Sequence, residues 1–334
     1  MLVIKRVAMN LIRVLPVIFL LGGLCSQVRA DPMEQWYIAP GKMIDVGGYR
    51  LHIYCTGEGT PTVILDAGMG GFSLDWYRVQ QSVSMKTRVC SYDRAGYGWS
   101  EPGPPPRTTD HIVEELYTLL DNSGNKPPYI LVGHSFGGYN MQYYTRLYPD
   151  QVAGLVLVDS SHPDQAERLP EIPSVREKSR AGKIVTVFVG QNTLQYYPEE
   201  IRFKVLPLLT QRKVNITHRR ESVNFVMSGY QVAHAAAFPD IPLIVISRGL
   251  HAWPDDPYGN MLESVWADMQ KELAGLSPHG RQIIATRSKH LIHLEQPDLV
   301  SAAIESLLDE PEQKLPLHET HMACMPEQPA SVDC

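Results

Sequence analysis

The stretch Tyr129–Asn140 reads YILVGHSFGGYN. An apolar, β-favouring run ends at Gly133, and a segment with helical spacing follows and ends near Pro149. The G-x-S-x-G pattern between them would occur by chance in roughly one chain in ten of this length, so its context must decide its meaning. A strand, a sharp turn and a helix are the context of a nucleophile elbow, whose flanking glycines avoid collisions. We therefore predict that Ser135 is an exposed nucleophile rather than an idle serine in a glycine-rich turn.

The composition is that of an ordinary globular protein. The chain has 334 residues, of which 44% are hydrophobic and 20% charged, enough for one substantial core and an inserted subdomain. A net charge of -6 with scattered basic residues argues against a nucleic-acid partner.

The first thirty residues have the pattern of a targeting segment. Lys5, Arg6 and Arg13 surround or precede the apolar run VLPVIFLLGGL, and Ala30 stands at a cleavage position before Asp31. We predict a signal peptide over 1–30 and a secreted or periplasmic protein. An uncleaved membrane anchor is the alternative, although the run is shorter than the roughly 20 residues that span a bilayer.

Cysteine usage agrees with export. Cys25 follows Leu24 rather than a small residue, which disfavours a lipoprotein. Four cysteines remain after residue 30, an even number in an oxidising compartment: Cys55, Cys90, Cys324 and Cys334. Their three possible pairings stay open at this point.

Strand-like and helical segments alternate along the chain, which indicates a parallel α/β sheet covered on both faces. Strands are expected at 50–56, 62–68, 88–93, 129–133, 154–160, 241–249 and 281–287, with a helix at 108–124. The connection over 161–240 is too long for a simple loop and predicts a helical lid. The expected core is 31–160 with 241–309, followed by a tail at 310–334.

From about residue 45 to 308 the chain resembles the α/β-hydrolase superfamily, in its lid-bearing branch of serine esterases, lactonases, C-C bond hydrolases and proline iminopeptidases. The motifs that carry the resemblance are VILDAGMGGFSLDW, SYDRAGYGWSEPGP, LVGHSFGG and KHLIHLEQP. The resemblance implies a mostly parallel eight-stranded sheet and a catalytic triad. It does not specify the substrate.

A serine nucleophile needs a base, and the base needs an acid that orients it. On this fold the order along the chain is Ser, acid, His, so His290 in RSKHLIHLEQPDLV is the expected base and His293 its rival. Family members place the acid either after the strand that follows the nucleophile helix, where Asp159 stands, or after the penultimate strand. Asp255 and Asp256 are the candidates at the second place; we expect Asp159.

Backbone N–H groups should stabilise the oxyanion of the transition state. Phe136 follows the nucleophile, at the positive end of a helix, and should supply one donor. The resemblance assigns the second donor to Met69. The family usually has His-Gly in that loop, whereas this chain has Ala67 and Gly68.

Two roles are possible for Arg94 in SYDRAGYGWS. In the first, it binds a substrate carboxylate, because a guanidinium matches carboxylate geometry. In the second, which we expect, Asp93 and Arg94 bond to backbone amides and carbonyls near the oxyanion loop.

The resemblance also bears on the cysteines. In the family's strand order the strands that hold Cys55 and Cys90 are neighbours, which makes that bridge reasonable and leaves Cys324 with Cys334. A soft metal bound by His318, His321 and Cys324 is an alternative role for the tail.

These observations predict an exported serine hydrolase that cleaves a carboxylic ester or related acyl bond of a small molecule through an acyl-enzyme on Ser135. The resemblance implies no metal and no organic cofactor. A lyase or perhydrolase with the same triad, or a ligand receptor that has lost catalysis, are the alternatives. The oligomeric state is left open.

Overall fold

The computed structural model describes residues 38–169 and 193–309. The predicted signal peptide and the tail, with Cys324, Cys334 and the metal site considered there, lie outside these ranges. Within the two described ranges no helix has both the length and the apolar character needed to cross a bilayer.

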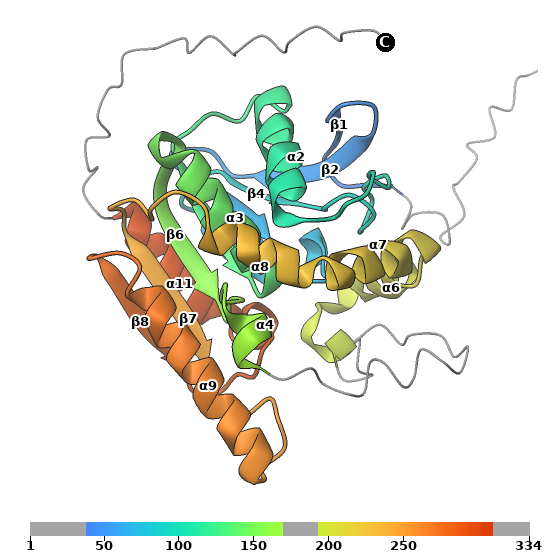
Figure 1. Cartoon of the computed structure of the whole chain (residues 1–334). Coiled ribbons are helices and arrows are strands. Elements are labelled where there is room, and N and C mark those ends of the chain that lie inside the picture. The colour runs from blue at the N-terminus through green and yellow to red at the C-terminus, as the bar shows by residue number, and fades with distance from the viewer. Residues whose placement is uncertain (1–37, 170–192, 310–334) are drawn as a thin grey trace, which may run out of the picture. The chain divides into compact units, whose positions relative to one another are not determined.

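An eight-stranded sheet forms the centre of the fold (Figure 1), with the strands in the order β1-β2-β4-β3-β5-β6-β7-β8. The strands are β1 (Lys42–Asp45), β2 (Arg50–Thr56), β3 (Thr62–Asp66), β4 (Val89–Tyr92), β5 (Tyr129–His134), β6 (Val152–Val158), β7 (Leu243–Arg248) and β8 (Gly280–Ala285). The pairs β1-β2 and β2-β4 are antiparallel, and all the others are parallel. The predicted fold class is confirmed, and β1 is a short edge strand that the sequence reading did not locate.

Helices cover both faces of the sheet, as expected for parallel strands that are apolar on both sides. They are α1 (Tyr77–Val83), α2 (Thr109–Asn122), α3 (Phe136–Leu147), α9 (Pro257–Ala274), α10 (Ile292–Glu295) and α11 (Pro297–Leu308), with the short η2 (Ser73–Trp76) before α1 and η3 (Pro149–Gln151) after α3. Apolar residues of α2, α3 and α9 pack on one face of the sheet, and those of α1 and α11 pack on the other. The parallel strands therefore all end at one edge, where side chains from distant parts of the sequence meet.

The long connection between β6 and β7 is largely helical where it is described. It contains α4 (Gln165–Arg168), η4 (Thr193–Tyr196), α6 (Glu199–Leu209), α7 (Arg212–Val223) and α8 (Phe225–Ala233). Helix α8 lies against α2 and α3 (Figure 1), and the hydroxyl of Ser228 accepts a hydrogen bond from the N–H of Thr109 at 3.1 Å. Helix α8 thus rests directly on α3, the helix that follows the elbow.

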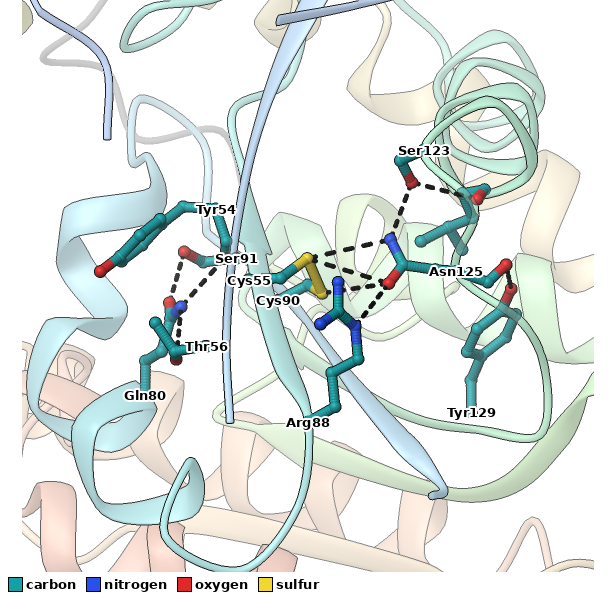
Figure 2. Close-up of a disulfide and its surroundings, with 11 residues drawn as sticks. Tyr54, Cys55, Thr56, Gln80, Arg88, Cys90, Ser91, Ser123, Asn125 and Tyr129 are labelled. Atoms are coloured by element: carbon teal, nitrogen blue, oxygen red, sulfur yellow. Dashed lines mark hydrogen bonds between the residues drawn. A yellow bond between two sulfur atoms is a disulfide. The ribbon is translucent and has the colours of Figure 1, made fainter. Parts of the chain in front are cut away.

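A disulfide joins β2 to β4. Cys55 and Cys90 are direct partners in the antiparallel register, with their Cα atoms 4.0 Å apart. Figure 2 shows the side chain of Asn125 beside the bridge, and its amide nitrogen lies 3.8 Å from the sulfur of Cys55. The predicted pairing of Cys55 with Cys90 is confirmed.

Loss of this bridge should weaken the fold without touching the elbow. Since the linked residues are 35 positions apart, we expect the Cys55→Ser, Cys90→Ser double variant to lose about 3–4 kcal/mol of unfolding free energy. Urea denaturation of the variant and of oxidised wild-type protein would measure the difference, and wild type with a reductant should match the variant. Equal stability of all three samples would contradict the prediction.

Candidate active site

Ser135 stands at the end of β5 and directly before α3, with φ 51 and ψ -119. A non-glycine residue with positive φ is strained, and such strain is held in place only by close surrounding packing. The packing here depends on glycines: a Cβ on Gly137 would lie 2.5 Å from the carbonyl oxygen of Asp66, and one on Gly133 would lie 2.6 Å from that of Gly137. The geometry is that of the nucleophile elbow predicted from the sequence.

The loop after β3 packs directly on the elbow. A Cβ on Gly68 would lie 2.8 Å from Nδ1 of His134 and 3.2 Å from the Cβ of Ser135, so a side chain there would force the elbow to shift, and Met69 is the next residue. Phe136 is the first residue of α3, and its N–H is one of the first-turn amides that have no acceptor within the helix. The two backbone amides expected to hold an oxyanion thus belong to segments that meet at Ser135.

Arg94 supports that loop from inside the protein. Its guanidinium is buried and donates to the carbonyl oxygens of Ala67 and Gly68, to Asp66 at 2.7 Å and to Glu221 of α7 at 3.0 Å. Asp93 accepts hydrogen bonds from backbone amides at 2.7 and 2.8 Å. The structural interpretation of Arg94 is confirmed, because its donors are directed to protein groups in the core.

The candidate acid and base meet at the same edge of the sheet. Asp159 follows β6 and His290 lies between β8 and α10, yet Nδ1 of His290 is 2.6 Å from Oδ2 of Asp159. Asp159 is fully buried, whereas the His290 side chain is 36% exposed. A carboxylate at Nδ1 selects the tautomer with hydrogen on Nδ1, which leaves Nε2 free to accept a proton.

Further donors surround Asp159. Its Oδ1 accepts from the backbone N–H of Arg248 at 3.2 Å and from Nε1 of Trp266 at 2.9 Å, and its Oδ2 accepts from Nη1 of Arg248 at 2.9 Å. Burial alone would raise the pKa of Asp159, but the hydrogen bond from His290 and the charge of Arg248 outweigh burial and lower that pKa. The carboxyl group therefore stays ionised at neutral pH.

Arg248 and Trp266 were missed in the sequence. Arg248 is a charged residue at the end of the otherwise apolar strand β7, just before the segment that holds Asp255 and Asp256. That position is the one sequence feature that could have indicated a role for it. Trp266 had no such signal, because it is one apolar residue on the buried side of α9.

Three histidine rings pack against one another beside the elbow, with His134 tilted by 47° to His290 and by 44° to His293. His134 donates from Nε2 to the carbonyl oxygen of His290 at 2.9 Å, and its ring centroid lies 4.2 Å from that of His293. His293 is buried against Trp76, at 4.6 Å between ring centroids. Burial, followed by repulsion from His290, lowers the pKa of His293 to about 3. His293 is thus a neutral packing residue, and the geometry favours His290 as the base.

The alternative acids have other contacts. Asp256 caps α9, accepting from the N–H of Gly259 at 2.7 Å, and Asp255 accepts from the side chain of Asn260 at 3.2 Å. Both belong to the start of one helix, whereas Asp159 contacts His290 directly. The geometry favours Asp159.

An apolar cluster packs beside the elbow. Phe136 and Tyr139 of α3 pack with Phe225 of α8, whose ring centroid is 6.0 Å and 5.2 Å from theirs. Met69 packs against the same cluster, which also contains Ile112 and Val232. This cluster joins α3, the helix of the elbow, to α8 of the long connection.

One group of possible metal ligands occurs among the described residues. The ligand atoms of His162, Asp164 and Glu272 lie within 4.8 Å of one another. Arg168 already donates to Glu272 at 2.6 Å, and both carboxylates are exposed. The arrangement is that of a surface ion-pair group, and we assign no metal to it.

Comparison with known proteins identifies the family. The family model for the alpha/beta hydrolase fold matches residues 61–240, more than half of the chain. The chain therefore belongs to the α/β-hydrolase family.

A lipase is among the proteins to which this chain is similar in sequence. The uncharacterized protein YbdG of Bacillus subtilis is 33% identical over 128 residues, which cover 37% of this chain and 39% of YbdG. The lipase LipV of Mycobacterium tuberculosis is 34% identical over 123 residues, 36% of this chain and 46% of LipV. Each match thus spans less than half of the relative. A thermophilic esterase from Thermogutta terrifontis shares the fold, with a TM-score of 0.58 and 22% identity over 81% of this chain and 98% of the esterase.

Proposed function

We propose that this hydrolase is a serine esterase, which cleaves a carboxylic ester or related acyl bond of a small molecule through an acyl-enzyme on Ser135. The observation that carries the proposal is the 2.6 Å contact between His290 Nδ1 and Asp159 Oδ2. This contact lies at the end of the sheet where Ser135 directly follows β5. In this reaction His290 takes the proton of the Ser135 hydroxyl as the oxygen attacks the substrate carbonyl. His290 then returns the proton to the leaving alcohol, and water releases the acyl group by the same steps.

The backbone amides of Phe136 and Met69 would hold the oxyanion. Each such donor typically contributes about 3–4 kcal/mol to lowering the barrier, because it is already oriented before charge develops. The dipole of α3 adds to this stabilisation, since its positive end lies at Phe136. The carbonyl contacts of Arg94 with Ala67 and Gly68 support the proposal, because they hold the loop in which Met69 stands.

The proposal includes export and a lid. The disulfide between Cys55 and Cys90 supports an oxidising compartment, in agreement with a signal peptide over 1–30. Residues 161–240 would form the lid, and the apolar side chains of Met69, Phe136 and Phe225 support an uncharged acyl group beneath it.

A fluorophosphonate probe tests the mechanism directly. We expect the probe to modify Ser135 in the protein spanning residues 31–334, as mapped by peptide mass spectrometry, because it reacts with serines that a base activates. A parallel series of p-nitrophenyl esters of increasing acyl length should show turnover that varies with chain length. Modification at Ser135 without ester turnover would point to lyase or perhydrolase chemistry, or to another acyl bond. No modification of folded protein would contradict the proposal and favour a ligand receptor.

A further inference from the structure

The carboxylate of Asp159 is shared between two side-chain donors, His290 and Arg248. Its Oδ2 lies 2.6 Å from Nδ1 of His290 and 2.9 Å from Nη1 of Arg248. Arg248 is the last residue of β7, next to β6 in the sheet, so the strand order itself brings the guanidinium to the acid. Because Arg248 partly neutralises the Asp159 carboxylate, that carboxylate stabilises a protonated His290 less than it would alone.

Contacts with two tryptophans and a glutamate fix the position of the Arg248 side chain. Its guanidinium carbon lies 4.6 Å from the ring centroids of both Trp253 and Trp266, and its Nε donates to Glu263 at 3.1 Å. The side chain is only 4% exposed. Trp266 also donates to Oδ1 of Asp159, so the same ring orients both members of the ion pair. A cation enclosed in this way cannot turn toward solvent.

We propose that Arg248, held between Trp253 and Trp266, is a positioning residue that orients Asp159 and weakens its hold on the proton of His290, so that the enzyme stays active at lower pH. This inference rests on the proposed function, since it assumes that His290 is the base.

Few other charges act on His290. Within the described part of the chain, the titratable and charged groups that face it, directly or through Asp159, are Asp159, His134, His293, Arg248 with Glu263, and the nearby Lys289 and Glu295. Burial and the neighbouring histidines lower the pKa of His134 well below its usual range, and His293 behaves similarly, so both rings are neutral at working pH. Glu295 accepts from the N–H of Lys289, on the exposed side of the loop. Asp159 and Arg248 are therefore the two buried charges that decide how strongly His290 holds its proton.

The direction of the effect follows from the charges. Protonated His290 is attracted by Asp159 and repelled by Arg248. Removing Arg248 leaves the full carboxylate charge for His290, so the histidine should remain protonated to higher pH. A protonated histidine cannot accept the serine proton, and activity should then begin only at a higher pH.

The test is the pH dependence of kcat/KM for Arg248→Met, measured with the best p-nitrophenyl ester. We expect the midpoint of the acid-side limb to rise by about one pH unit. We also expect kcat/KM at the optimum to fall about tenfold, because Asp159 loses a charged hydrogen-bond donor. Arg248→Lys keeps the charge without the planar fork, and should keep the wild-type midpoint with a lower rate.

Arg107→Met is the matched control. Arg107 is equally buried and pairs with Glu115 of α2 at 2.8 Å, in contact with none of the residues of the site. Its loss should lower stability while leaving the acid-side midpoint unchanged. If Arg248→Met does not fold, Arg248→Gln removes the same single charge while keeping a polar side chain beside Asp159 and Glu263, and tests the same shift.

A wild-type midpoint in folded Arg248→Met protein, with Ser135 still labelled by fluorophosphonate, would overturn the inference and leave the proposed function intact. An equal shift in Arg107→Met would also overturn it, because the shift would then reflect general destabilisation. Failure of wild-type Ser135 to react with the probe would instead contradict the proposed function itself.

Discussion

Replacement of Ser135 by alanine is expected to lower ester turnover by about 10⁴- to 10⁶-fold, to the level that binding and the oxyanion donors alone sustain. The variant loses only a hydroxyl, and the backbone of Ser135 continues to accept the hydrogen bonds from the amides of Gly138 and Ser161. The fold should therefore stay intact. Initial rates with the preferred p-nitrophenyl ester, together with fluorophosphonate labelling, measure the effect.

Ser82→Ala serves as a control for the loss of a serine. Ser82 is an exposed residue of α1, whose hydroxyl lies 3.4 Å from Glu305. This variant should keep wild-type turnover and labelling. Turnover by folded Ser135→Ala protein at the wild-type rate would exclude Ser135 as the nucleophile.

Asp159→Asn should reduce turnover by about 10³- to 10⁴-fold. Asparagine tolerates the positive φ of 41 at this position, so the backbone should be retained. Its amide group, however, neither carries the charge that stabilises protonated His290 nor reliably selects the Nδ1–H tautomer. Arg248 would also lose one of its two carboxylate partners, and we expect a lower unfolding free energy in addition to the lower rate.

The two rival aspartates supply the matched controls. Asp255→Asn and Asp256→Asn make the same chemical change at the start of α9, where asparagine is also a good helix cap. Both variants should turn over ester at close to the wild-type rate. A near wild-type Asp159→Asn enzyme beside an inactive Asp255 or Asp256 variant would transfer the role of the acid to that residue.

Local features of the site were predictable from local sequence. Ser135 lies between an apolar strand and a helix, and glycines flank it, so both its position and its strained turn could be read from one short stretch. The loop with Asp93 and Arg94 could likewise be assigned a supporting role. In each case the residues that define the feature are close in sequence, and their steric requirements leave few residue types possible.

The contacts of Asp159 could not be predicted in this way. Its partners Arg248, Trp266 and His290 are 89, 107 and 131 positions away. They meet because β7 lies beside β6 and because α9 packs back onto the sheet. The edge strand β1 was missed for a related reason, since a four-residue strand depends mainly on pairing with β2.

Most helices and strands, the elbow and the candidate catalytic residues follow from local backbone and apolar patterns, and could be predicted from the sequence. Tertiary structure decided which of them meet. Sheet order brought Asp159 to His290 rather than the aspartates at the start of α9, and it placed the buried Arg248 between two tryptophans beside the same carboxylate. The physical reason is that charge interactions depend on distance and burial in the folded chain, and neither is encoded in spacing along the sequence.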